Sequence, residues 1–238
     1  MLGKNKVAMV VAEFMGVATL AMAVYTIMAR TSFPLFSGMA AGVVVALFTL
    51  AVGAVSGAHL NPAITFGLWS IRKISTAKAI IYIAAQALGG LAAWALLKYF
   101  LGHSLTSIAG TGTAISWKVF VAEAIGTGIF AMGFAAAIVQ KFEGAKLAGT
   151  IGLSLFVGVL VASLASNAVL NPAVAAGIQS WSKTYALAPL AGSLVGMNLY
   201  TMLFAGATVE TSKAAVVVSS EIVKPKTTKK KSTTKKKK

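Results

Sequence analysis

The feature that most constrains this chain is a helix-interrupting tripeptide that occurs twice inside long runs without charged residues. Asn61-Pro62-Ala63 recurs as Asn171-Pro172-Ala173, and the spacing from Glu13 to the first copy equals the spacing from Glu123 to the second. An internal repeat in an apolar chain, with an interrupted segment at matching places in both halves, indicates a membrane channel or transporter built from two halves.

The composition excludes most other classes. Apolar residues make up 58% of the chain and charged residues 11%, which is too few charges to cover a soluble globule. The chain has no cysteine and no aspartate, and only five glutamates, so we expect no disulfides and no metal site. Because no nucleophile–base pair and no phosphate-binding loop is recognisable either, the sequence predicts a protein without enzymatic activity and without a cofactor.

The charge-free runs locate the membrane spans. A helix needs roughly 20 apolar residues to cross the hydrocarbon core, and four runs fit one crossing each: about 7–29, 79–97, 119–140 and 184–209. Of these, 7–29 and 119–140 are each interrupted by a single glutamate, Glu13 or Glu123. Two runs, 31–71 and 147–182, are too long for one crossing, and each holds one Asn-Pro-Ala. A full span followed by a re-entrant half-helix explains both, so we expect six spans and two half-helices over about 62–70 and 172–180.

The chemistry of the two tripeptides predicts that a helix starts at each of them. Proline is favoured at the first helical position and asparagine is a favoured cap just before it. Two half-helices entering from opposite faces bring their positive N-terminal ends together near the midplane. The amides of Asn61 and Asn171 then become hydrogen-bond donors for a passing neutral solute, while the dipoles oppose cations and protons. Ordinary loop turns would explain one copy, but not two in register.

At this level of detail the chain resembles the aquaporin, or major intrinsic protein, family. The resemblance covers residues 5–208 and includes the segment Ser-Gly-Ala-His-Leu-Asn-Pro-Ala-Ile-Thr at 56–65. It also includes the Ala-Glu pairs at Glu13 and Glu123, Ala85-Gln86 with Gly89-Gly90, and Pro189 with Gly192 and Gly196. It implies an all-α membrane protein: an aquaporin-like bundle of six transmembrane helices plus two re-entrant half-helices in an inverted repeat, assembled as a homotetramer.

The resemblance also implies where the outer selectivity filter lies, and there this chain departs from its relatives. Family members carry an arginine directly after the second Asn-Pro-Ala, a position that is Val174 here; the other filter positions correspond to Ala41, Val159 and Ala168. We therefore expect a wide, apolar and uncharged outer gate that passes solutes of glycerol size alongside water.

Several other residues have structural interpretations. Glu13 and Glu123 are intramembrane charges, which by default suggest function, but their place in the repeat favours carboxylates that accept hydrogen bonds from the loop of their own half. Gly42 and its repeat partner Gly152 predict a close crossing of two spans. His59 precedes the first motif and is a candidate for the pore entrance.

The basic residues predict the topology. The expected channel domain covers 1–208, with repeat one at about 7–100 and repeat two at about 117–208, followed by a disordered lysine-rich tail at 209–238. The positive-inside rule predicts a multi-pass plasma-membrane protein with both termini in the cytoplasm. A signal peptide ending near residue 23 is the rival reading of the N-terminus, which Glu13 in the apolar core disfavours. The tail is expected to contact anionic lipid, and no specific nucleic-acid partner is expected.

Two functions of different kinds follow. The first is a passive channel for water and small uncharged solutes that excludes ions and protons. The alternative is a structural or tethering membrane protein of the same fold with little conductance, because the valines at 159 and 174 favour dewetting of a narrow pore. The sequence does not choose among water, glycerol, urea, ammonia, hydrogen peroxide and metalloid acids.

Overall fold

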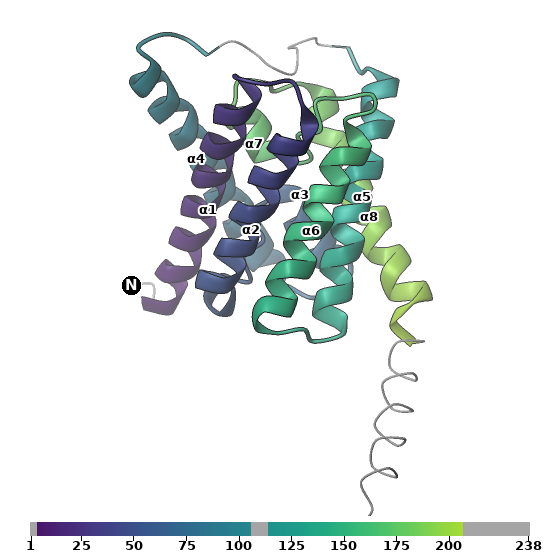
Figure 1. The fold of residues 1–238 in the computed structure, drawn as a ribbon. Helices are drawn as coiled ribbons and strands as arrows, with labels where there is room; N and C mark the ends of the chain where they lie inside the picture. The colour runs from purple at the N-terminus through teal and green to yellow at the C-terminus, as the bar shows by residue number, and fades with distance from the viewer. Residues whose placement is uncertain (1–3, 106–113, 207–238) are drawn as a thin grey trace, which may run out of the picture.

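The computed structural model describes residues 4–105 and 114–206, and within them all regular structure is helical (Figure 1). Six helices are long and apolar enough to cross a membrane: α1 (Lys4–Met28), α2 (Pro34–Ser56), α4 (Thr76–Leu101), α5 (Trp117–Val139), α6 (Gly144–Ala162) and α8 (Lys183–Leu203). Two short helices, α3 (Pro62–Ser70) and α7 (Pro172–Gly177), follow α2 and α6. The protein is therefore a multi-pass membrane protein, and the predicted fold class is confirmed.

The outward faces of the long helices carry large apolar side chains. Val43, Leu47, Leu153 and Val195 are all more than half exposed. A helix that is apolar on every side belongs in a membrane, where hydrocarbon replaces water as the surrounding medium. The exposed side chains thus explain why the bundle needs no polar shell at this depth.

Local signals set where the helices begin and end. Ser75 caps α4 by accepting a hydrogen bond from the Lys78 N–H, and Ser182 caps α8 by accepting one from the Tyr185 N–H. Helix α2 ends at Gly57, whose φ of 94° lies in the left-handed region that glycine adopts without strain. The second half-helix is shorter than the predicted 172–180, because Gln179 turns to a positive φ of 55° and the chain leaves the helix there.

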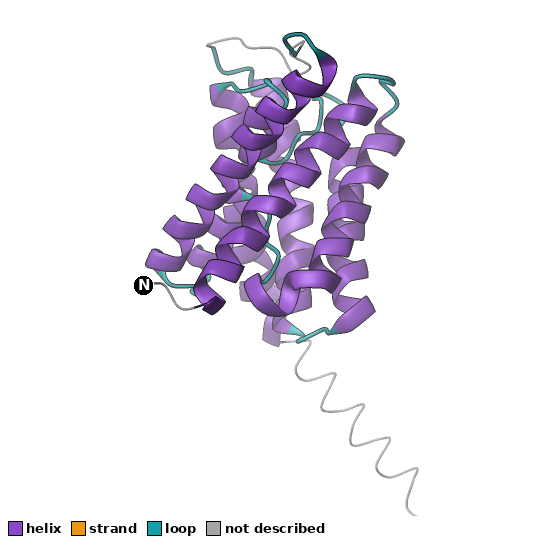
Figure 2. Ribbon diagram, turned by 90° about the vertical axis from the view of Figure 1, so that its left-hand side faces the viewer, coloured by secondary structure: helices purple, strands orange, loops and turns teal. Residues whose placement is uncertain are grey.

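The bundle has two similar halves that share their half-helices. Helix α1 packs against α2 and α4, α5 packs against α6 and α8, and α2 contacts α6 between the halves. The half-helix α3 packs against α8 as well as α4, while α7 packs against α4 and α1. Each half-helix is therefore held by long helices of the opposite half, and Figure 2 shows the loops that lead to them inside the bundle.

The two ends of the described chain lie at the same end of the bundle. Figure 1 shows the start of α1 and the end of α8 at the bottom, with the half-helices α3 and α7 in the interior. The predicted lysine-rich tail at 209–238 lies outside the described residues.

Candidate functional site

The two Asn-Pro-Ala motifs cap the half-helices. Asn61 has an extended backbone and its Oδ1 accepts the Ala63 N–H at 2.8 Å. Asn171 has the same conformation and accepts the N–H groups of Ala173 and Val174 at 3.0 and 3.2 Å. With proline at the first helical position, both starts have the N-terminal chemistry that the sequence predicts.

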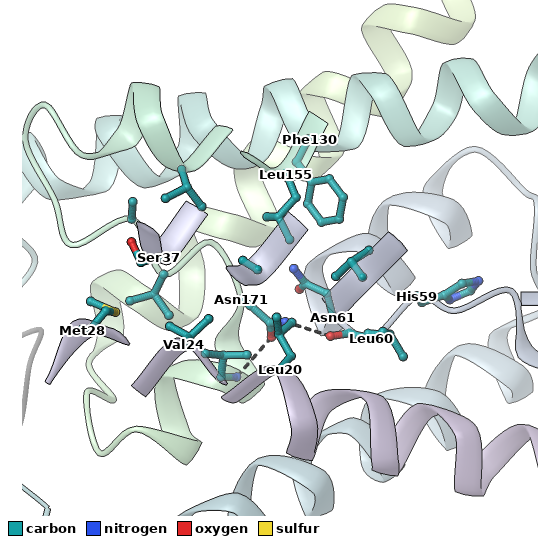
Figure 3. A pocket seen from close by; sticks show the side chains of 16 residues that line it. Leu20, Val24, Met28, Ser37, His59, Leu60, Asn61, Phe130, Leu155 and Asn171 are labelled. Atoms are coloured by element: carbon teal, nitrogen blue, oxygen red, sulfur yellow. Dashed lines mark hydrogen bonds between the residues drawn. The ribbon is translucent and has the colours of Figure 1, made fainter. Parts of the chain in front are cut away.

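The two caps also bridge the halves of the molecule, which the sequence did not indicate. The Asn61 Nδ2 donates to the Leu170 carbonyl at 2.9 Å, and the Asn171 Nδ2 donates to the Leu60 carbonyl at 2.8 Å (Figure 3). A primary amide has two N–H donors, so each asparagine keeps a second N–H for which the described residues provide no partner. Both amides lie on the wall of the same cavity.

The loop before each cap has an unusual backbone. Ala58 and Leu60 have positive φ values of 46° and 49°, and their repeat partners Ala168 and Leu170 have 49° and 53°. Non-glycine residues in the left-handed region cost about 1–2 kcal/mol each, so other contacts must hold these loops. The matching geometry in both halves indicates that the strain serves to aim the Leu60 and Leu170 carbonyls at the opposite asparagine.

Buried carboxylates hold both loops. Glu13 accepts the His59 N–H at 3.0 Å and the Leu60 N–H at 2.8 Å. Glu123 accepts the corresponding N–H groups of Val169 and Leu170 at 3.0 and 2.7 Å. Both side chains are fully buried and neither lines the cavity. Two charge-assisted hydrogen bonds to consecutive backbone amides fix the conformation that each cap requires.

Each carboxylate also has a serine of its own loop as a hydrogen-bond partner, Ser56 for Glu13 and Ser166 for Glu123, and the first half has a further partner. Glu123 accepts a hydrogen bond from the Ser166 hydroxyl at 2.7 Å. Glu13 accepts a hydrogen bond from the Gln86 amide at 2.7 Å. The same amide donates to the Thr65 hydroxyl, which in turn contacts the His59 Nδ1 at 3.1 Å. A polar chain therefore joins the cavity wall at His59 to a buried carboxylate in the first half only.

The half-helix tips, the long helices and the loops enclose one elongated cavity. Figure 3 shows Met28 and Ser37 at one end of it, His59 at the other, and the two asparagines between them. Its wall is otherwise apolar, and the lining side chains are Leu20, Val24, Met28, Ser37, Ala41, Val45, His59, Leu60, Asn61, Phe130, Leu155, Val159, Ala168, Val169, Asn171 and Val174. A wider vestibule of about 350 Å³, rich in serine, adjoins the Met28 end.

The four positions expected to form the outer filter all line this cavity. Ala41, Val159, Ala168 and Val174 contribute no charge and no side-chain donor. The cavity is small, with about 20 Å³ of space for water, where one water molecule needs roughly 10–15 Å³. Helix α1 adds Leu20, Val24 and Met28 to the same wall.

The sequence analysis missed these three α1 residues. They recur every fourth residue, which is the spacing of one helix face, but α1 is apolar all round, so that spacing does not stand out. No group of three or more histidine, cysteine, aspartate or glutamate side chains placed to hold a metal occurs within residues 4–105 and 114–206.

Six spanning helices, two half-helices meeting tip to tip, and a narrow cavity along their caps define a membrane channel of the inverted-repeat type. The sequence profile of the major intrinsic protein family matches residues 3–204, and the chain belongs to this family. It is therefore a channel for water or small solutes, as members of this family are channels and not enzymes.

Known relatives agree with this assignment. The chain is 29% identical to Aquaporin Z of Photorhabdus laumondii over 189 residues, covering 70% of this chain and 81% of that protein. It is 33% identical to Aquaporin TIP1-1 of Zea mays over 189 residues, covering 73% and 75%. The X-ray structure of the aquaglyceroporin from Plasmodium falciparum superposes with a TM-score of 0.68 at 22% identity, covering 84% of this chain and 95% of that one, which supports the fold.

Proposed function

We propose that this protein is a passive channel for water and small uncharged solutes up to the size of glycerol, and that it excludes ions and protons at the paired half-helices. The observation that carries the proposal is the meeting of the Asn61 and Asn171 amides on one cavity wall, each with an N–H left for a solute. A neutral solute gains hydrogen bonds there, whereas a cation meets two positive helix ends.

The chemistry of the filter supports a neutral solute in the same way. The described wall residues from Ser37 to the asparagines carry no formal charge, so no side chain compensates an ion for its lost hydration shell. Exclusion of ions then rests on desolvation and on the half-helix dipoles, without the arginine of the relatives. Passage of a glycerol-sized solute requires the aliphatic side chains of the wall to move apart, because the cavity has only about 20 Å³ of space for water.

The remaining parts of the proposal concern the assembly and its setting. We place the channel domain at 1–208 as two repeats, in a homotetramer with one pore per protomer. We place it in the plasma membrane with both termini cytoplasmic, because Arg72, Lys73, Lys141 and Lys146 then lie inside with the lysine tail. Contact of the tail with anionic lipid follows from its charge.

Stopped-flow light scattering on proteoliposomes tests the proposal. Vesicles that contain the wild-type protein should shrink faster than protein-free vesicles in at least one of a panel of gradients that includes water, glycerol and urea, with no added proton or cation leak. Asn171→Leu should lower the flux of the permeant solute about tenfold or more, because it removes the donors at the midplane.

Asn198→Leu is the matched control, since this amide lies on α8 and bonds to Ser70 and to the Leu194 carbonyl, away from the cavity. Its flux should equal that of the wild type. A folded wild-type protein that accelerates no solute would favour the alternative function, a structural or tethering membrane protein that works through its basic tail.

A further inference from the structure

One face of α1 forms a continuous stripe along the outer half of the cavity. Leu20, Val24 and Met28 follow one another at four-residue steps, about 6 Å apart along the helix. In Figure 3 the stripe runs from Leu20 beside the asparagines, through Val24, to Met28 at the mouth. Helix α1 thus contributes one side chain at each depth of this half of the pore.

The opposite walls supply matching side chains at the same depths. The chain reverses between α1 and α2, so Ser37, Ala41 and Val45 of α2 run antiparallel to the α1 stripe. Met28 and Ser37 both border the vestibule, which fixes this register. Val24 therefore lies at the depth of Ala41. We use the name middle ring for Val24 together with the four expected filter positions that line the same cavity, Ala41, Val159, Ala168 and Val174.

Within the middle ring, Val24 is the residue that α1 contributes. Ala41 and Ala168 end at Cβ and leave space. Val174 is 1% exposed and Val159 4% exposed, whereas Val24 keeps 8%, and all three line the cavity. Opposite Ala41, whose side chain ends at Cβ, the two γ-methyl groups of Val24 are the apolar atoms that α1 contributes to the middle ring.

We propose that Val24 is a specificity-determining residue of this channel, and that its side chain sets the largest neutral solute that the pore admits. This inference rests on the proposed function. The middle ring contributes no side-chain donor or acceptor, so selection there depends on size and on the water that a solute must shed. In this chain α1 takes over the narrowing of the filter that bulky or charged side chains would otherwise provide.

The test is the ratio of glycerol to water permeability in vesicles of the same preparation. Val24→Ala removes the γ-methyl groups and should raise the ratio about tenfold, which is the discrimination typical of one or two buried methyl groups. Val24→Ile adds one methylene and should lower the ratio, mainly by slowing glycerol. The second variant keeps the test valid should the alanine variant fold poorly.

Val17→Ala is the control. Val17 lies on the same helix and is fully buried, but it faces α4 near Gly89 and does not line the cavity. Its ratio should equal that of the wild type despite a similar packing loss. An unchanged ratio in the Val24 variants, or an equal change in Val17→Ala, overturns the role of Val24 while leaving the channel intact. A wild-type protein with no flux of any solute overturns the proposed function, and this inference with it.

Discussion

At the scale of single residues, the pore depends on backbone groups held in an unfavourable conformation. Leu60 and Leu170 take left-handed φ values, which turns their carbonyls toward Asn171 and Asn61. Each carboxylate binds the N–H of the strained leucine and of the residue before it. The glutamates thus stabilise the loops whose carbonyls join the two halves, although they lie outside the cavity.

Replacing a carboxylate should therefore affect folding more than selectivity. Glu13→Ala leaves the N–H groups of His59 and Leu60, and one N–H of the Gln86 amide, without their acceptor. Each unsatisfied buried donor costs about 1–3 kcal/mol, so the variant should lose most of its folded yield and melt at a clearly lower temperature in detergent. Thermal unfolding followed by size-exclusion chromatography measures both.

The control for this experiment is Glu143→Ala, since Glu143 is exposed and makes no side-chain cap bond at the start of α6. It should melt like the wild type. A Glu13→Ala protein that folds normally and newly conducts protons would show that the carboxylate belongs to a proton path.

At the scale of elements, close contacts between backbones join the two halves. Helices α2 and α6 cross where a Cβ on Gly152 would lie 2.6 Å from the Gly42 carbonyl oxygen, and a Cβ on Gly42 would lie 2.7 Å from the Gly152 carbonyl oxygen. These oxygens belong to the main chain and cannot swing aside. Within a membrane, packing of this kind drives helix association, because lipid is as apolar as the side chains.

Gly152→Ala should accordingly destabilise the protein by about 1–3 kcal/mol through overpacking. Gly149→Ala is the matched control on the same helix, because a Cβ there meets no atom within 4 Å. The control should be neutral or slightly stabilising, by about 0.5–1 kcal/mol, since alanine favours a helix over glycine. Melting temperatures in one detergent compare the two, and equal values would argue against the tight α2–α6 crossing.

At the scale of the whole molecule, the orientation in the membrane follows from charge. The start of α1 and the end of α8 lie at one end of the bundle (Figure 1), so we expect both to face the same side of the membrane. Lysine and arginine are retained on the cytoplasmic side, and nine lysines occur between residues 224 and 238. This distribution predicts that the lysine-rich tail is cytoplasmic.

Protease protection tests this topology. Trypsin added to intact cells should leave the tail attached, whereas trypsin added to inside-out vesicles should remove it and leave the membrane part largely whole. An antibody against a C-terminal tag reads the result on a blot. Loss of the tag from intact cells would reverse the proposed orientation.

The sequence by itself determined the class of molecule and much of the detail near the motifs. The duplication of Asn-Pro-Ala in charge-free runs was enough to predict six spans and two half-helices, because proline, asparagine and charge act on the chain locally, while the family was predicted from the resemblance of the motifs. The start of α3 at Pro62 and of α7 at Pro172 follows from the same local chemistry.

Only the tertiary structure decided which surfaces meet. The bond from each asparagine to the opposite loop joins the first repeat to the second, and no local preference marks such a distant partner. The pore-facing stripe of α1 could not be recognised in the sequence either. Aliphatic side chains suit both the lipid-facing side of a helix and the wall of an apolar pore, so the two sides of α1 have the same composition. The expectation of a wide gate considered the filter positions alone, whereas the fold also places Val24 of α1 on the wall of the cavity that Val159 of α6 lines.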